Sequence, residues 1–138
     1  MRYFDASALA KRYVRENGSV KIRRLLSSEL AATSRYSAVE IASALARRTR
    51  EGAVSHEDRE RTLAALRTDL SAMLIVELTA EIVNRAQELL QRHPLRAGDA
   101  VQLASCLHLR EELEDAVSLV AFDERLVAAA RKERVVLA

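Results

Sequence analysis

The chain has 138 residues, of which 49% are hydrophobic and 30% are charged, and its formal net charge is +2. This composition is typical of a folded globular protein and excludes a disordered chain, and no apolar run reaches the roughly 20 residues that a membrane helix needs. The N-terminus begins directly with a strand-like segment instead of a basic region followed by an apolar stretch. We therefore expect a cytoplasmic protein without a membrane association.

Apolar periodicity and capping residues predict strands that alternate with helices along the chain. The predicted strands are 2–5, 30–33, 73–78, 118–122 and 134–137, of which 73–78 is expected to be buried. The predicted helices are 7–16, 19–28, 37–50, 56–72, 80–93, 98–113 and 124–132. Gly52 and Pro94 end two of these helices, and Ser55 and Thr79 are expected to cap two others at their N-termini.

This order of elements predicts the fold class. Short apolar strands that alternate with helices form mostly parallel sheets covered by helices. We expect an α/β fold with a sheet of about five short strands flanked by helices. No linker, repeat or low-complexity tract divides the chain, so residues 1–138 are expected to form a single domain.

Side chains that commonly bind transition metals are scarce. Cys106 is the only cysteine and lies in an apolar helical run, so it is expected to be a core residue. His56, His93 and His108 show no helical pairing and are expected to have surface or packing roles. A metal site in this chain would therefore depend on carboxylate oxygens.

Two aspartates directly follow predicted strands. Asp5 comes after Tyr3 and Phe4, and Asp123 comes after the run 118–122. In open parallel sheets ligands bind beyond the carboxyl ends of the strands, so both acids lie where a site is expected. A predicted helix follows each of them, and aspartate is also a favoured N-cap residue. Helix capping is therefore an open alternative for each acid.

Glu40 and Asp99 each interrupt an apolar helix, where acids are seldom buried unless they are paired or bind a metal. The alternatives are an ion pair with Arg47 or Arg48 for Glu40 and a favourable helix-dipole interaction for Asp99. If the four acids converge, each pair of charges 4 Å apart repels by about 1–4 kcal/mol. A hard cation such as Mg²⁺ or Mn²⁺ would relieve this repulsion and could activate water for phosphodiester hydrolysis.

Four segments resemble, in order, the acidic motifs of PIN-domain nucleases, particularly the VapC-type toxins. They are Tyr3–Tyr13 (YFDASALAKRY), Ser37–Ile41 (SAVEI), Leu95–Ala104 (LRAGDAVQLA) and Phe122–Leu126 (FDERL). The set spans nearly the whole chain. The resemblance implies a PIN-like fold and a metal-dependent endoribonuclease that hydrolyses RNA without a covalent intermediate. It also implies that this enzyme is the toxin of a toxin–antitoxin pair.

The resemblance also implies roles for individual residues. Mg²⁺ or Mn²⁺ would be held by four acids, the central Asp5 and Asp99 and the completing Glu40 and Asp123. Ser7 matches a hydroxyl position that would orient Asp5 or a metal-bound water, with helix capping as the alternative. Arg96 matches a basic position that would hold Asp99 or phosphate, with a solvated arginine as the alternative.

A homodimer and a small antitoxin are further implications of the resemblance. An apolar groove between the early helices could receive an antitoxin helix or strand. Core packing is the alternative for its residues, which are Ile22, Leu25, Leu26, Leu45 and Ala46. The chain departs from the family pattern at Ala121, where a hydroxyl residue is usual, and at residues 132–134, where a glycine is usual.

Basic residues are the candidates for holding the RNA backbone. The first 50 residues contain 11 of the 22 Lys and Arg but only 4 of the 20 Asp and Glu. The candidates are Lys11, Arg12, Arg47, Arg48 and Arg50, and solvated surface charge is the alternative for each. On an ideal helix Arg47 and Arg48 share the side of Glu40 and could extend the acidic site. With only three Tyr and two Phe, we expect RNA shape to matter more than base stacking.

Two functions of other classes remain open at this point. A phosphatase with Asp5 as nucleophile would also begin with a strand and an aspartate. Such enzymes carry a second aspartate two residues further on, where this chain has Ser7. The other alternative is a catalytically silent module that binds RNA or protein on the same fold. The presence of all four acids favours the nuclease over this module.

Overall fold

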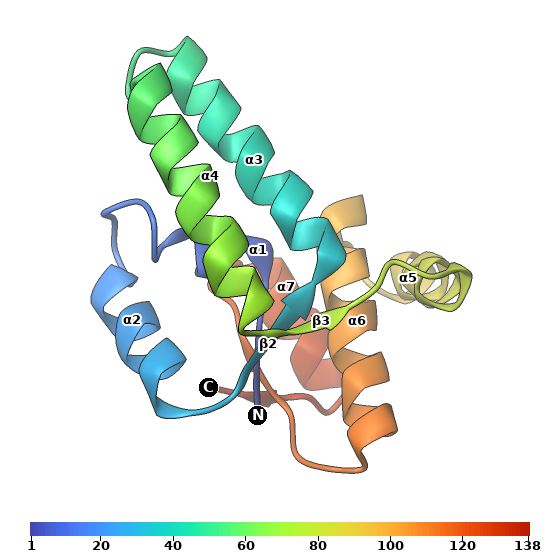
Figure 1. The fold of residues 1–138 in the computed structure, drawn as a ribbon. Coiled ribbons are helices and arrows are strands. Elements are labelled where there is room, and N and C mark those ends of the chain that lie inside the picture. The colour runs from blue at the N-terminus through green and yellow to red at the C-terminus, as the bar shows by residue number, and fades with distance from the viewer.

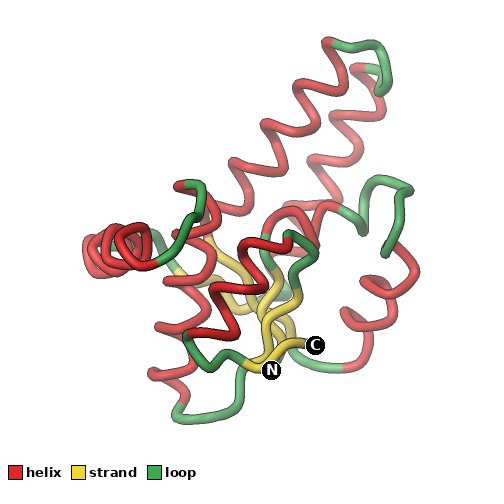
Figure 2. Tube along the Cα trace, turned by 180° about the vertical axis from the view of Figure 1, so that it is seen from behind, coloured by secondary structure: helices red, strands yellow, loops and turns green.

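The computed structural model describes residues 1–138, and its centre is a sheet of five short strands. These are β1 (Arg2–Phe4), β2 (Ala31–Ser34), β3 (Leu74–Val76), β4 (Ser118–Val120) and β5 (Val136–Leu137). They lie in the order β3-β2-β1-β4-β5, and every neighbouring pair is parallel. The expected α/β class is confirmed. Helices surround the strands, and the two chain termini lie close together at one end of the sheet (Figure 2).

Seven helices connect and cover the strands. They are α1 (Ala6–Ala10), α2 (Ser19–Ser28), α3 (Arg35–Arg50), α4 (His56–Ser71), α5 (Ala80–Arg92), α6 (Ala97–Leu113) and α7 (Glu124–Lys132). The predicted caps are present, because Ser55 accepts from the Asp58 amide at 3.1 Å and Thr79 from the Ile82 amide at 3.3 Å. Helices α3 and α4 form a long antiparallel pair that extends well beyond the sheet (Figure 1). No helix is both long and apolar enough to cross a membrane.

The core has two parts, one on each face of the sheet. Successive residues of a strand point to opposite faces. Tyr3 therefore packs into the larger cluster with α5, α6 and α7, while Phe4 packs into the smaller one with α1 to α4. Cys106 is 1% exposed in the larger cluster, as its apolar neighbours in the sequence predicted.

Two predicted elements differ from the structure. The first helix is expected to reach residue 16, but α1 ends at Ala10. The amides that follow bond to carbonyls only three residues back: Lys11 N–H donates to the Ala8 carbonyl and Arg12 N–H to the Leu9 carbonyl. Such bonds tighten and end a helix. The strand at 73–78 is expected to be buried, but the structure has the shorter strand β3 there. This strand lies at the edge of the sheet, and its Leu74 is 38% exposed.

The residues 132–134, which lack the usual glycine, still make the turn into β5. Arg134 adopts a left-handed backbone with φ of 59°. A side chain in this conformation is strained by roughly 1–2 kcal/mol. The turn is therefore formed without glycine and at a modest loss of stability.

The strand order determines where a ligand site is expected on the sheet. β1 lies between β2 and β4, so the chain runs outward from β1 on one side and returns to its other side for β4. In open parallel sheets ligands bind at such a switch point, beyond the carboxyl ends of the strands. Asp5 directly follows β1, and Asp123 follows β4 after two intervening residues.

Candidate metal centre

Asp5 is a buried carboxylate with two protein hydrogen bonds. It is 2% exposed, and its Oδ1 accepts from the Ala8 amide at 2.8 Å, which caps α1. Its Oδ2 accepts from the Ser7 hydroxyl at 2.8 Å. Each carboxylate oxygen has a second lone pair, so capping leaves Asp5 able to accept a further ligand. The Ser7 hydroxyl thus contacts Asp5, and the N-cap of α1 is Asp5 and not Ser7.

Three of the predicted acids line one cavity. Asp5, Glu40 and Asp99 enclose a space of about 150 Å³ together with Ser7 and four apolar residues of α1 and α3. Asp5 comes from the end of β1, Glu40 from the second turn of α3 and Asp99 from the first turn of α6. The fold thus brings together acids that are up to 94 positions apart in the sequence.

Burial and mutual repulsion disfavour the charged form of these acids. The pKa of Asp5 is raised to about 6, chiefly by burial and also by the Asp99 charge, against the opposing hydrogen bonds from Ala8 and Ser7. The pKa of Glu40 is raised by burial and by the charges of Asp5 and Asp99, while a hydrogen bond from Gln102 opposes this. A cation in the cavity would stabilise the ionised carboxylates.

Asp123 lies at the margin of this group. Its side chain is exposed, and its Oδ1 accepts from the Leu126 amide at 2.9 Å as the N-cap of α7. It does not line the cavity. Its charge nevertheless reaches Asp99, whose pKa is raised first by burial and then by Asp123. Asp123 is therefore an outer member of the acidic group.

The donor set fits a hydrated hard cation better than a fully protein-bound one. No three His, Cys, Asp or Glu side chains are close enough together to enclose an ion. Mg²⁺, however, usually keeps several waters and is bound through only one or two carboxylates. An open cavity with three carboxylates, one of them almost fully buried, suits such an ion.

Sequence reasoning missed two residues that contact Glu40. Gln102 is 1% exposed, and its Nε2 donates to Glu40 Oε2 at 2.8 Å. Gly98 lies so close to Glu40 that a Cβ there would collide with Oε1. The only sequence signal was the polar Gln102 inside the apolar run of α6, one turn after Asp99. The ion pair of Glu40 with Arg47 or Arg48, the alternative considered for this acid, does not form.

Arg96 and Lys11 differ in their surroundings. Arg96 makes no ion pair, and its charge lowers the pKa of Asp99 without outweighing burial and the charge of Asp123. Lys11 Nζ lies 3.3 Å from Glu16 and 4.7 Å from the ring centre of Phe122. Lys11 is thus already held by an anion and an aromatic ring.

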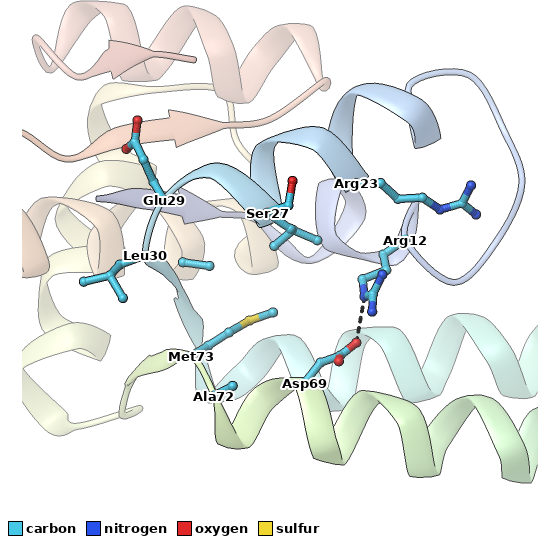
Figure 3. Close-up of a pocket in the computed structure, with 10 residues that line it drawn as sticks. Arg12, Arg23, Ser27, Glu29, Leu30, Asp69, Ala72 and Met73 are labelled. Atoms are coloured by element: carbon cyan, nitrogen blue, oxygen red, sulfur yellow. Dashed lines mark hydrogen bonds and ion pairs between the residues drawn. The ribbon is translucent and has the colours of Figure 1, made fainter.

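Arg12 lies away from the acids and has a structural contact. Its Nε donates to Asp69 Oδ2 at 2.8 Å, and the Tyr13 hydroxyl donates to the same oxygen at 2.7 Å. The pair links the end of α1 to α4 beside a second cavity of about 310 Å³ between α2 and α4 (Figure 3). Arg12, a candidate for holding the RNA backbone, is thus paired with Asp69 and lines this second cavity and not the acidic one.

Arg47 and Arg48 lie next to the acidic cavity. Neither forms an ion pair, and both line a cavity of about 200 Å³ that shares Ser7 and Ala44 with the acidic cavity. Two cations without anionic partners next to an acidic site can hold the backbone of a polyanion. Arg50, by contrast, is exposed and lines neither cavity.

Arg12 on the one hand, and Arg47 with Arg48 on the other, lead to contrasting predictions. Arg12→Ala should lower the free energy of unfolding by about 1 kcal/mol or less, because the ion pair is partly exposed, and should leave RNA affinity unchanged. Arg47→Ala with Arg48→Ala should weaken RNA binding and reduce the salt slope by about 1.4, as expected for two contacts to single-stranded phosphates. Urea unfolding and filter binding at several salt concentrations measure both. Equal RNA affinities for the two variants would contradict the assignment.

The expected apolar groove is mostly core. Ile22, Leu25 and Leu45 are at most 8% exposed in the smaller core cluster, which supports the packing alternative. Leu26 packs against the same cluster and also lines the cavity between α2 and α4. The histidines also have packing or surface roles. His93 is 8% exposed with Nε2 2.7 Å from Glu133 Oε1, His56 is exposed, and His108 lies 3.6 Å from Glu81.

The arrangement defines a class of protein: an open parallel α/β domain with clustered carboxylates at its switch point. The PIN domain family matches residues 2–132. The chain therefore belongs to the PIN domain family, and the resemblance seen in the four acidic segments is confirmed.

Known proteins of this family include close relatives. The chain is 38% identical over 110 residues to ribonuclease VapC45 of Mycobacterium tuberculosis strain CDC 1551 and equally to ribonuclease VapC49 of strain H37Rv. These matches cover 76% of this chain and 74% of each relative.

Solved structures share the whole fold. VapC20 of Mycobacterium tuberculosis, described as a toxin that cleaves the sarcin–ricin loop, has a TM-score of 0.70 at 23% identity, over 94% of this chain and 95% of that one. A toxin–antitoxin complex from Klebsiella pneumoniae has a TM-score of 0.68 at 18% identity, over 93% and 91%.

Proposed function

We propose that the protein is an endoribonuclease that hydrolyses RNA phosphodiester bonds with Mg²⁺ or Mn²⁺ at the site of Asp5, Glu40 and Asp99. The observation that carries this proposal is the shared cavity of these three acids beside Arg47 and Arg48. The 38% identity to two ribonucleases supports RNA as the substrate. When bound, the ion would activate a water and stabilise the charge on the reacting phosphate.

The chain's own residues perform the remaining tasks of this reaction. Asp5 and Asp99 would hold the ion, with Glu40 binding it directly or through water and Asp123 acting from the margin. Ser7 fixes the carboxylate of Asp5 through its 2.8 Å hydrogen bond. Arg47 and Arg48 would bind the backbone next to the scissile phosphate, and Arg96 would offset negative charge at Asp99.

The test is cleavage of a structured RNA by the purified protein with Mg²⁺, with Mn²⁺ and with chelator, beside p-nitrophenyl phosphate as a phosphatase substrate. We expect RNA cleavage that requires the ion and no turnover of the phosphate monoester. Turnover of the monoester alone would favour the Asp5-nucleophile phosphatase. Metal-independent RNA binding without any cleavage would favour the catalytically silent module.

We further infer that the protein is the toxin of a toxin–antitoxin pair and forms a homodimer. The Klebsiella pneumoniae complex of the same fold supports the antitoxin partner. The cavity between α2 and α4, next to Leu30 with 73% exposure, offers apolar surface for a short antitoxin segment. Because the proposed substrate is cellular RNA, we place the protein in the cytoplasm. Light scattering of the purified chain tests the dimer, and loss of toxicity on co-expression with its antitoxin tests the pairing.

A further inference from the structure

A continuous chain of buried hydrogen bonds leads from the sheet to Glu40. The Tyr3 hydroxyl donates to Gln102 Oε1 at 2.7 Å, and Gln102 Nε2 donates to Ser37 Oγ at 2.9 Å and to Glu40 Oε2 at 2.8 Å. Tyr3, Ser37 and Gln102 are each at most 1% exposed. Water therefore does not compete for the bonds of Gln102 with Tyr3 and Ser37, while the bond to Glu40 is partly buried.

The direction of every bond in this chain is determined. Thr33 Oγ1 lies 2.7 Å from the Phe4 carbonyl, which can only accept, so the Thr33 proton is used there. The 2.7 Å contact between Thr33 and Ser37 must then use the Ser37 proton. Ser37 can therefore only accept from Gln102, and the second Nε2 proton of Gln102 is directed at Glu40.

Ser37 and Glu40 determine which way the Gln102 amide faces, and Tyr3 then holds its Oε1. If the amide were turned over, Oε1 would face the Glu40 carboxylate and the Ser37 oxygen, whose proton is already used. Two acceptors would then face one another in a dry environment, which is strongly unfavourable. In the observed orientation Nε2 donates to both of these acceptors, and the Tyr3 hydroxyl donates to Oε1. The network thus allows a single arrangement, in which Gln102 donates to the acid.

We propose that Gln102 is a positioning residue that holds Glu40 in place for the metal, with Tyr3 fixing Gln102. The bond to Oε2 anchors one oxygen of the carboxylate, and Oε1 has no hydrogen bond within the protein. The proposal rests on the proposed function, because it assigns Gln102 a role only through Glu40. Residues that orient a metal ligand in this way typically change metal affinity 10–100-fold when they are lost.

A purely structural role for Gln102 makes a different prediction. A buried amide that only satisfies Tyr3 and Ser37 would affect stability, and its loss would leave metal affinity unchanged. A positioning role requires that the loss appear in metal affinity and that it depend on Glu40. Residues that act through one another give non-additive changes in a double-mutant cycle.

The experiment measures Mn²⁺ affinity by calorimetry in the full chain. The variants are Gln102→Met, which keeps the length without polar atoms, Glu40→Gln and the double variant. We expect Gln102→Met to weaken Mn²⁺ binding roughly 10–100-fold and to have little further effect once Glu40→Gln is present. Cys106→Ala, which removes a buried side chain from the same helix outside the network, is the control and should retain wild-type affinity.

The outcomes separate this inference from the proposed function. Weakened binding in Glu40→Gln with wild-type binding in Gln102→Met would overturn the positioning role and leave the metal site standing. Additive losses in the double variant would also overturn it. If the wild type bound no Mn²⁺, both proposals would fall.

Two measurements do not depend on Gln102→Met folding. Tyr3→Phe removes only the hydroxyl that fixes the amide and should weaken Mn²⁺ binding in the same direction. In the wild type, the two Nε2 protons of Gln102 should give separate, slowly exchanging nuclear magnetic resonance signals. Rapid exchange of these protons, or wild-type affinity in Tyr3→Phe, would contradict the network described here.

Discussion

Asp5→Asn is expected to abolish RNA cleavage while stabilising the metal-free protein at neutral and alkaline pH. Loss of this ligand should reduce cleavage by more than the roughly 100-fold that loss of an outer partner causes. Asparagine still offers an oxygen to the Ala8 amide, so the cap of α1 is retained. It also removes a buried negative charge that Asp99 repels.

The gain in stability should depend on pH in a defined direction. Burial raises the pKa of Asp5 from 3.8 to about 6 in the folded protein. The folded chain therefore binds this proton more tightly than the unfolded chain, and its stability falls as the pH rises from about 4 to 6. The shift corresponds to about 3 kcal/mol. Asp5→Asn should gain up to this amount at pH 8 and almost none at pH 4.

Urea unfolding in the presence of chelator, at pH 8 and at pH 4, measures this difference. Added Mn²⁺ should raise the stability of the wild type at pH 8 and should leave Asp5→Asn unchanged. A variant that was less stable than the wild type at pH 8, or that bound Mn²⁺ with unchanged affinity, would contradict the assignment of Asp5 as a buried metal ligand.

Gly98→Ala is expected to weaken metal binding with no loss of stability. Alanine is favoured over glycine in a helix by up to about 1 kcal/mol, and Gly98 lies in α6 with ordinary backbone angles. Its new Cβ, however, would collide with Glu40 Oε1 and push this carboxylate out of its place. We expect Mn²⁺ affinity and cleavage to fall roughly 10–100-fold, as for other residues that position a ligand.

Gly52→Ala gives a poor control because Gly52 has a positive φ of 77°. Ala97→Gly, one residue before Gly98 and at an exposed position, is better matched. It changes the helix propensity in the opposite direction without touching Glu40. Wild-type Mn²⁺ affinity in Gly98→Ala would show that Glu40 has room to move and does not depend on this close approach.

The sequence predicted the fold well where periodicity was strong. All five strands and seven helices occur near their expected places, because apolar runs and caps such as Thr79 act locally. β3 was the exception. Its apolar residues predicted burial, but burial of a strand depends on whether it has neighbours on both sides, and the strand order places β3 at the edge.

The sequence predicted the acids of the site but not the residues that contact Glu40. Asp5 and Asp123 presented a choice between capping and ligand binding, and the structure shows capping by both without excluding the second role. Gln102 and Gly98 could not be assigned, because their partner Glu40 is about 60 positions away along the chain and only the packing of α6 against α3 brings them together. The ion pair of Arg12 with Asp69 could not be predicted either, because it joins residues 57 positions apart.

The most direct test of the central claim is cleavage of a structured RNA by Asp99→Asn beside the wild type over a range of Mn²⁺ concentrations. Asp99 is the acid to test because it lines the cavity and, unlike Asp5, is not the N-cap residue of a helix. The account predicts metal-dependent cleavage by the wild type and none by Asp99→Asn, with both proteins equally folded. Cleavage by Asp99→Asn at the wild-type rate and with the wild-type dependence on Mn²⁺ would contradict it.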